Sequence, residues 1–132
     1  NFQKPCACLA SSLEQVVACG ADFGVAGQVL AQKWWPGALT LVLQIPDGTF
    51  AGFRVPAHAV PTAVAAAVPH QGTLLLTSAN RSGEADPQSC AAAIADLGEA
   101  VTLALDAGPC EGNVPSTVVR VAGAELSLLR EG

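Results

Sequence analysis

Two segments of this sequence place small polar side chains where a folded chain could bind an anion. Ser78 and Asn80 follow the apolar run Leu74-Leu75-Leu76, so a hydroxyl and a carboxamide stand at the end of a predicted strand. Ser116 follows a loop rich in glycine and proline, residues 106–115. Exposed backbone N–H groups in such loops form anion-binding nests. These residue types suit a phosphate, a ribose or a carboxylate.

Two arginines add positive charge to this picture. Arg54 lies between apolar residues in Gly-Phe-Arg-Val-Pro and should not be buried without an anionic partner. Arg130, in Leu-Leu-Arg-Glu-Gly, raises the same question. Residue types alone leave the structural alternatives open: Ser78 and Asn80 suit a turn that caps a strand, the loop suits an ordinary surface connection, and Arg54 suits a salt bridge to one of eleven acids.

The sequence offers no recognisable nucleophile or metal site. His58 and His70 show no Ser-His-Asp or Cys-His spacing, and we expect His58 to form a hydrogen bond at a helix entry. We expect Trp34-Trp35 to belong to the core and a turn. No pair of the five cysteines has C-x-x-C spacing, so they are expected to be reduced, mostly buried thiols of a cytosolic protein. We assign no catalytic side chain and no metal ligand.

Composition sets the broad class. The 132 residues are 51% apolar and 13% charged, with a net charge of −5, which favours a large core and disfavours nonspecific binding to nucleic acid. No apolar stretch approaches the roughly 20 residues that span a bilayer. We expect residues 1–132 to form a single domain.

The elements that must position these side chains alternate between helix and strand. Ser11-Ser12-Leu13-Glu14 fits a capping box, Pro61 fits the first helical position, and Asp86-Pro87 fits an N-cap followed by N1. The predicted helices are 12–19, 24–33, 62–68 and 87–97, and the predicted strands are 38–45, 52–55, 73–77, 101–105, 117–121 and 126–130. This alternation predicts an α/β fold with a mixed sheet.

Five segments occur in an order that resembles a known family. They are WPGALTLVL (35–43), GFRVPAH (52–58), LTSANRSGE (76–84), DAGPCEGNVPSTVVRV (106–121) and LLREG (128–132). Each is a weak motif alone, but the ordered set resembles the Sua5/YrdC/YciO family, specifically its threonylcarbamoyl-AMP synthases in their short, YrdC-like form.

The resemblance implies a fold and a site. The fold is a YrdC-like twisted, largely mixed sheet flanked by helices, with a concave, positively lined ligand cavity. Carried over position by position, the nucleotide-binding residues are Ser78, Asn80, Ser116 and Arg130, and the residues near threonine and phosphate are Thr40 and Arg54.

The implied reaction joins L-threonine, bicarbonate and ATP into L-threonylcarbamoyladenylate and releases pyrophosphate, with Mg²⁺ on the phosphates. The product serves the N6-threonylcarbamoyladenosine (t6A) modification of adenosine 37 in tRNA. Further implied partners are tRNA or other t6A-pathway proteins, and the implied location is cytoplasmic, away from membranes. Catalysis would consist of positioning and charge neutralisation.

The sequence departs from the family pattern in two ways. The family's Thr-Asp-Thr-x-Tyr-Gly-like stretch and its Lys-x-Arg motif have no match, so we expect an N-terminal segment to be missing and the chain alone to be inactive. Glu111 is an added carboxylate, and Arg120 stands where the family often has Asp.

Two other functions stay open, a noncatalytic RNA-binding domain and a carbamoyl-AMP-forming domain of a carbamoyltransferase.

Overall fold

The computed structural model describes residues 7–68, 74–81, 83–110 and 115–132. The chain divides into two compact units. We call Cys6–Leu76 with Pro115–Gly132 the sheet unit, and Asn1–Pro5 with Thr77–Val114 the helix–loop unit. Each unit is described by itself.

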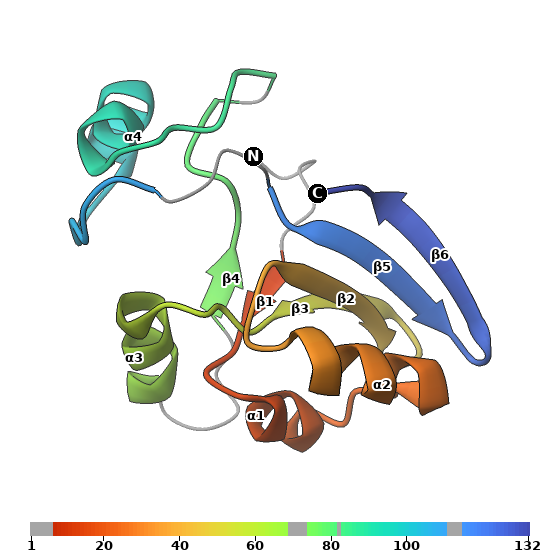
Figure 1. Cartoon of the computed structure of the whole chain (residues 1–132). Coiled ribbons are helices and arrows are strands. Elements are labelled where there is room, and N and C mark those ends of the chain that lie inside the picture. The colour runs from red at the N-terminus through yellow and green to blue at the C-terminus, as the bar shows by residue number, and fades with distance from the viewer. Residues whose placement is uncertain (1–6, 69–73, 82, 111–114) are drawn as a thin grey trace. The chain divides into compact units, whose positions relative to one another are not determined.

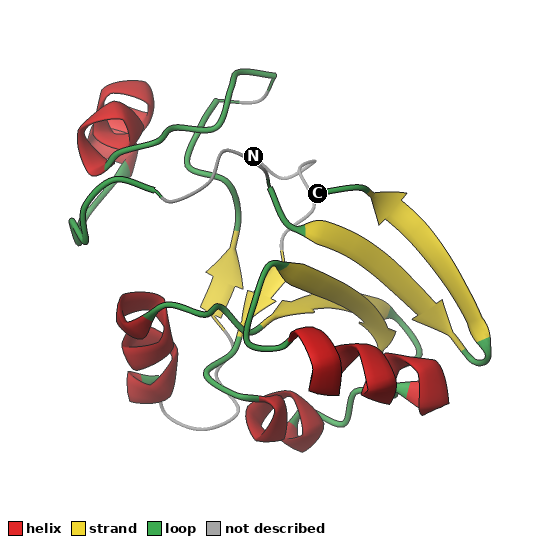
Figure 2. Ribbon diagram, in the orientation of Figure 1, coloured by secondary structure: helices red, strands yellow, loops and turns green. Residues whose placement is uncertain are grey.

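In its described residues, the sheet unit holds six strands and three helices, which can be followed in Figures 1 and 2. In chain order they are β1 (Ala7–Leu9), α1 (Leu13–Ala18), α2 (Gly24–Trp34), β2 (Leu39–Gln44), β3 (Phe50–Arg54), α3 (Ala59–Ala67), β4 (Leu74–Leu76), β5 (Thr117–Ala122) and β6 (Glu125–Arg130). The strand order is β4-β1-β3-β2-β5-β6. The β1–β3 and β2–β5 pairs are parallel and the other pairs are antiparallel. The predicted α/β class with a mixed sheet is therefore confirmed.

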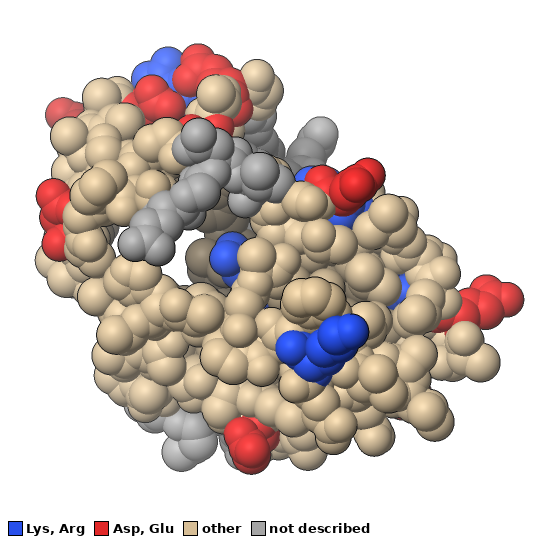
Figure 3. Space-filling model, viewed as in Figure 1, with Lys and Arg blue, Asp and Glu red and all other residues tan. Residues whose placement is uncertain are grey.

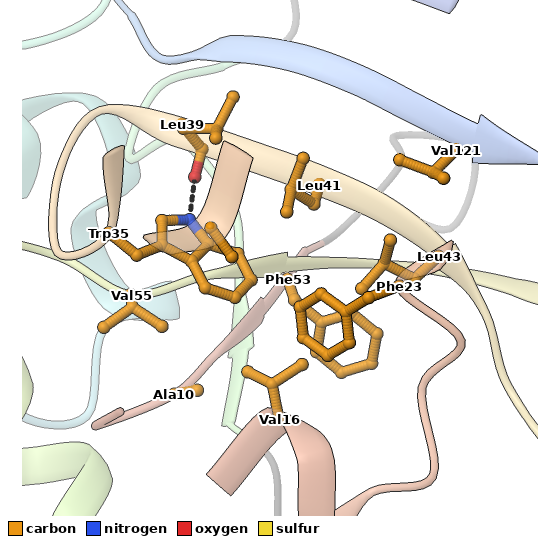
Figure 4. Packing of buried hydrophobic residues seen from close by; sticks show 11 residues of the cluster. Ala10, Val16, Phe23, Trp35, Leu39, Leu41, Leu43, Phe53, Val55 and Val121 are labelled. Atoms are coloured by element: carbon orange, nitrogen blue, oxygen red, sulfur yellow. Dashed lines mark hydrogen bonds between the residues drawn. The ribbon is translucent and has the colours of Figure 1, made fainter. Parts of the chain in front are cut away.

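The two faces of this sheet differ because side chains alternate along each strand. Leu41 and Leu43 of β2 are fully buried, and they pack with Phe53 of β3 and Val121 of β5. Helices α1, α2 and α3 lie on this side of the sheet (Figure 1). Figure 4 shows Val16 of α1 among these side chains. The strand residues that alternate with these core residues point to the opposite face of the sheet, which we call the open face.

Helix starts in the sheet unit follow capping chemistry. The Ser12 hydroxyl accepts a hydrogen bond from the backbone N–H of Gln15 at 3.2 Å, and the Gln15 side-chain oxygen accepts from the N–H of Ser11 at 2.7 Å. The predicted capping box of Ser11 and Glu14 was therefore wrong by one position, because Ser12 is the N-cap and Gln15 is the residue whose side chain bonds back. The His58 ring nitrogen Nδ1 accepts from the N–H of Val60 at 3.1 Å, which confirms its predicted place at a helix entry.

Two details of the predicted helices were wrong. Helix α3 begins at Ala59, so Pro61 lies within its first turn instead of at its first position. In the helix–loop unit, α4 (Cys90–Leu97) begins after Ser89, whose hydroxyl accepts from the N–H of Ala92 at 3.1 Å. Asp86-Pro87 is therefore not the N-cap pair, because a second capping residue lies three positions further on and satisfies the helix N–H groups.

The predicted strand 101–105 does not form. A short 3₁₀ turn, η1 (Gly98–Ala100), leads into a segment without strand geometry, in which Leu103 is 78% and Leu105 is 59% exposed. The alternating apolar pattern favours a strand, but a strand needs a neighbour for its hydrogen bonds. No strand in the described stretches pairs with this segment.

Predictions about the cysteines and tryptophans were correct only in part. Cys8, Cys19 and Cys90 are free thiols of intermediate exposure, and Cys110 is exposed. The prediction that the thiols are mostly buried was therefore wrong. The remaining cysteine, at position 6, lies outside the described residues. Trp35 joins the core, and its neighbour Trp34 is 54% exposed.

The surface carries few charges. Most of the face seen in Figure 3 is uncharged, in keeping with the low content of charged residues. Among the described stretches, no helix combines the length and the apolar character that crossing a membrane requires.

Candidate functional site

Three predicted site residues of the sheet unit form one hydrogen-bonded cluster. The Thr40 and Ser116 hydroxyl oxygens lie 2.9 Å apart, and both side chains are buried. Arg130 donates from Nε and Nη2 to the Ser116 carbonyl at 3.0 and 2.8 Å. Its Nη2 also donates to the Ser116 hydroxyl at 3.0 Å. The Arg130 guanidinium on β6 therefore holds Ser116, the residue just before β5, next to strand β2.

Arg54 lies next to this cluster on the open face. It pairs with Thr40 in the β2–β3 register. Its side chain is partly buried, and its Nε is buried without a hydrogen-bond partner. Burial lowers the pKa of the Arg54 guanidinium, and the nearby positive charge of Arg130 lowers it further. No ion pair joins Arg54 to an acid in the part of the chain that the structure describes, so the predicted alternative of a salt bridge has no support there.

The fold explains why these side chains meet. Leu39 and Leu41 point into the core, so Thr40 between them faces the open side. The start of β2 is anchored by a buried hydrogen bond of 2.8 Å from the Trp35 indole N–H to the Leu39 carbonyl, drawn as a dashed line in Figure 4. On the other side, Thr117 of β5 donates to the Ala38 carbonyl at 3.0 Å, which brings the adjoining serine to the start of β2.

Two glycines shape the site and were not selected from the sequence. A Cβ on Gly52 would lie 3.5 Å from Thr40 Cγ2, so the absence of a side chain leaves room on the open face beside Thr40. Gly132 packs so closely on Pro115 and Thr117 that a Cβ there would overlap their backbone. For Gly52 the available signal was a glycine inside a strand, which often marks a close approach of a ligand or another backbone.

The other two predicted residues lie in the helix–loop unit. Ser78 follows the end of β4 after one intervening residue, and its side chain is partly buried. Asn80 is 9% exposed, and its Nδ2 donates to the Glu84 carbonyl at 2.5 Å. The same unit contains the start of the glycine-rich loop, where Asp106 accepts from the N–H of Gly108 at 2.9 Å. Glu111 lies outside the described residues.

Arg54 together with Thr40, Ser116 and Arg130 forms a four-residue cluster, and this cluster has the chemistry of an anion site. Two guanidinium groups and two hydroxyls converge on one face, and none of them contacts a carboxylate among the described residues. A charge about 4 Å from one guanidinium gains roughly 4 kcal/mol at an effective dielectric constant of about 20. The described side chains include no group of three or more His, Cys, Asp or Glu residues that could hold a metal.

A separate cavity lies on the helix side of the sheet. It has a volume of about 860 Å³ and is lined by residues such as Trp35, Val55 and Ala63. It contains none of the predicted site residues, and its lining is mainly apolar. The site is therefore assigned from convergent polar groups on the open face, not from the size of a cavity.

The chain resembles known proteins in sequence and in fold. The family described as "Telomere recombination", whose sequence model is named after Sua5, YciO and YrdC, matches residues 1–132. A Mycobacterium tuberculosis protein whose name proposes a threonylcarbamoyl-AMP synthase is 37% identical over 113 residues, which cover 78% of this chain and 50% of that protein.

Solved structures extend the comparison. Pyrococcus abyssi Sua5, in a complex with L-threonine, superposes with a TM-score of 0.85 at 26% identity, over 96% of this chain and 39% of that one. Escherichia coli YciO shares the fold, with a TM-score of 0.74 at 17% identity over 97% of this chain and 66% of its own. The chain thus spans about half of the tuberculosis relative and less of the Pyrococcus protein.

Proposed function

Because this chain belongs to the Sua5/YciO/YrdC family, we propose that the protein containing it forms L-threonylcarbamoyladenylate for t6A synthesis in tRNA. Its substrates would be L-threonine, bicarbonate and ATP, and pyrophosphate would leave. The names of the relatives and the threonine bound to one of them support this proposal. The observation that carries it is the cluster of Arg54, Thr40, Ser116 and Arg130, which presents on one face two hydroxyls and two cations that no described carboxylate contacts.

The chemistry suits a site without a nucleophilic side chain. The threonine amine and bicarbonate give a carbamate and water. A carbamate oxygen then attacks the α-phosphorus of ATP, and the bond to the bridging oxygen of the β-phosphate breaks to release pyrophosphate. Negative charge is present throughout, so fixed donors that need no rearrangement lower the barrier. The proposed role of the cluster is to hold and neutralise phosphate oxygens while the carbamate approaches.

Each member of the cluster has a proposed task. Arg54 supplies a charge that no acid among the described residues neutralises. Thr40 and Ser116 can each donate a hydroxyl proton to a phosphate oxygen, or to one another, and Arg130 orients the Ser116 hydroxyl by donating to it. Ser78 and Asn80 are proposed as nucleotide contacts on the family resemblance, from the helix–loop unit.

The residues of this cluster do not fit a magnesium site. Mg²⁺ prefers carboxylates and water, and the cluster consists of guanidinium and hydroxyl groups. We therefore propose that Mg²⁺ would enter with ATP, bound to its phosphates, and not through a site in this cluster. A reaction that serves tRNA is proposed to take place in the cytoplasm.

The test is pyrophosphate release by the full-length protein with ATP, bicarbonate and L-threonine. Release that depends on threonine and falls at least tenfold in Arg54→Met supports the proposal. Lys33→Met, which removes a cation from the exposed surface of α2, is the matched control and should retain activity.

Other outcomes assign the protein differently. Absence of threonine-dependent release would contradict the synthase function. Release with carbamoyl phosphate in place of threonine and bicarbonate would indicate a carbamoyl-AMP-forming domain. Salt-dependent binding of tRNA without affinity for nucleotide would indicate a noncatalytic RNA-binding domain.

A further inference from the structure

A third arginine lies on the open face, outside the cluster. Val121 of β5 points into the core, so Arg120 beside it points to the opposite side of the sheet. The Arg120 guanidinium carbon lies 4.2 Å from the centre of the Phe50 ring on β3. Phe50 faces the same way because its neighbour Ala51 packs against the core. Arg120 therefore shares a face with Thr40 and Arg54.

The sheet register places Arg120 one step from the cluster. Thr40 pairs with Arg54 on one side and with Val118 on the other, and Val118 pairs with Arg130, so these residues form one row across the sheet. The next row holds Arg120. Two residues along a strand span roughly 7 Å, which is the offset between the two rows.

The row of Arg120 carries small or apolar neighbours. In this row β2 contributes Val42, β3 contributes Gly52, which has no side chain, and β6 contributes Ser127. Glu125 also faces this side, at the hairpin end of β6, but it pairs with Ala122, a further row away. No acid of the described chain forms an ion pair with Arg120.

The contact with Phe50 prepares Arg120 for an anion. A guanidinium stacked on a ring keeps its N–H groups, which lie in its own plane, available for hydrogen bonds. The Arg120 side chain is exposed, and its guanidinium makes no hydrogen bond within the described residues. The ring therefore restricts the side chain without using its donors, which reduces the entropy lost when a ligand binds.

We propose that Arg120 is a second phosphate-binding arm of the same site, which contacts the β- and γ-phosphates of ATP and the departing pyrophosphate. This inference rests on the proposed function. A triphosphate carries more negative charge than the two arginines of the cluster neutralise, and it is long enough to extend beyond one row. A donor on the leaving group becomes more valuable as the bond to the α-phosphorus breaks, because negative charge then collects on pyrophosphate.

The test is calorimetric binding of pyrophosphate, ATP and AMP to the full-length protein, in the wild type and in Arg120→Gln. The variant should bind pyrophosphate and ATP about tenfold more weakly, which corresponds to about 1.4 kcal/mol. It should bind AMP as the wild type does, because AMP lacks the two outer phosphates. Phe50→Leu keeps the charge but removes the ring, and it should weaken pyrophosphate binding by a smaller factor. Lys33→Gln controls for the loss of one positive charge.

The outcomes separate this inference from the proposed function. Wild-type protein that binds ATP and pyrophosphate, with Arg120→Gln unchanged, overturns the inference alone. Equal weakening of AMP and pyrophosphate also overturns it, since the arginine would then act on the α-phosphate or on the fold. Wild-type protein that binds neither ATP nor pyrophosphate overturns both.

Discussion

Replacing Arg54 by methionine should stabilise the free protein and weaken its binding of ATP. The guanidinium Nε is buried without a hydrogen-bond partner, and a second cation, Arg130, lies nearby. Methionine keeps an unbranched apolar stem that can fill the same space and needs no hydrogen bond. We expect the unfavourable free energy of burying this guanidinium to be offset when a bound anion accepts a hydrogen bond from it.

The structure sets the size of both effects. A buried donor without a partner costs about 1–3 kcal/mol, and we expect a gain of about 1 kcal/mol in the free energy of unfolding because Arg54 is only partly buried. That gain raises Tm by about 2–4 °C in a protein of 150–250 residues. Loss of one charge-assisted hydrogen bond, about 1.5–3 kcal/mol, weakens ATP binding roughly 10- to 150-fold.

The assays are thermal unfolding and calorimetric titration of ATP, in the wild type, Arg54→Met and Lys33→Met. Lys33 lies on α2 with its ammonium 5.3 Å from the centre of the Trp34 ring, so its loss removes the same charge away from the cluster. The control should bind ATP normally. A lower Tm together with unchanged ATP affinity in Arg54→Met would show that the guanidinium serves the fold, and would refute the reasoning.

Three other predictions concern two residues of the cluster, a hydrogen bond in the core and the reactivity of a thiol. Ser116→Ala and Arg130→Ala should each weaken ATP binding by about 1–3 kcal/mol in a titration, and unchanged affinity in both would reject the residue assignment. Trp35→Phe should lower the free energy of unfolding by about 1–3 kcal/mol in urea, because a buried carbonyl loses its donor; an unchanged midpoint would show that this bond contributes little. Burial, and then the neighbouring thiol of β1, raises the pKa of Cys19, so the thiolate forms only at higher pH. Iodoacetamide at pH 8 should therefore modify Cys19 more slowly than the exposed Cys110, and equal rates in mass spectrometry would contradict this.

Features set by neighbouring residues could be read from the sequence. Segments 38–45 and 117–121 were predicted as strands and form β2 and β5, and the predicted helix 12–19 matches α1 to within one residue at each end. The signals behind these predictions are local, because side-chain direction and capping depend on residues a few positions apart. The ordered motifs also indicated the family, which the match to residues 1–132 shows.

Features that depend on distant pairing were decided by the tertiary structure. Thr40 and Ser116 are 76 positions apart, and only the parallel pairing of β2 with β5 brings their hydroxyls within 2.9 Å. The segment 101–105 has the pattern of a strand but no partner among the described strands, so it does not become one. Sequence alone thus determined the motifs, the strand faces and the nature of the donors. The tertiary structure decided which donors converge and that no acid of the described residues forms an ion pair with Arg54, because strand neighbours are set by long-range register, which short-range patterns do not encode.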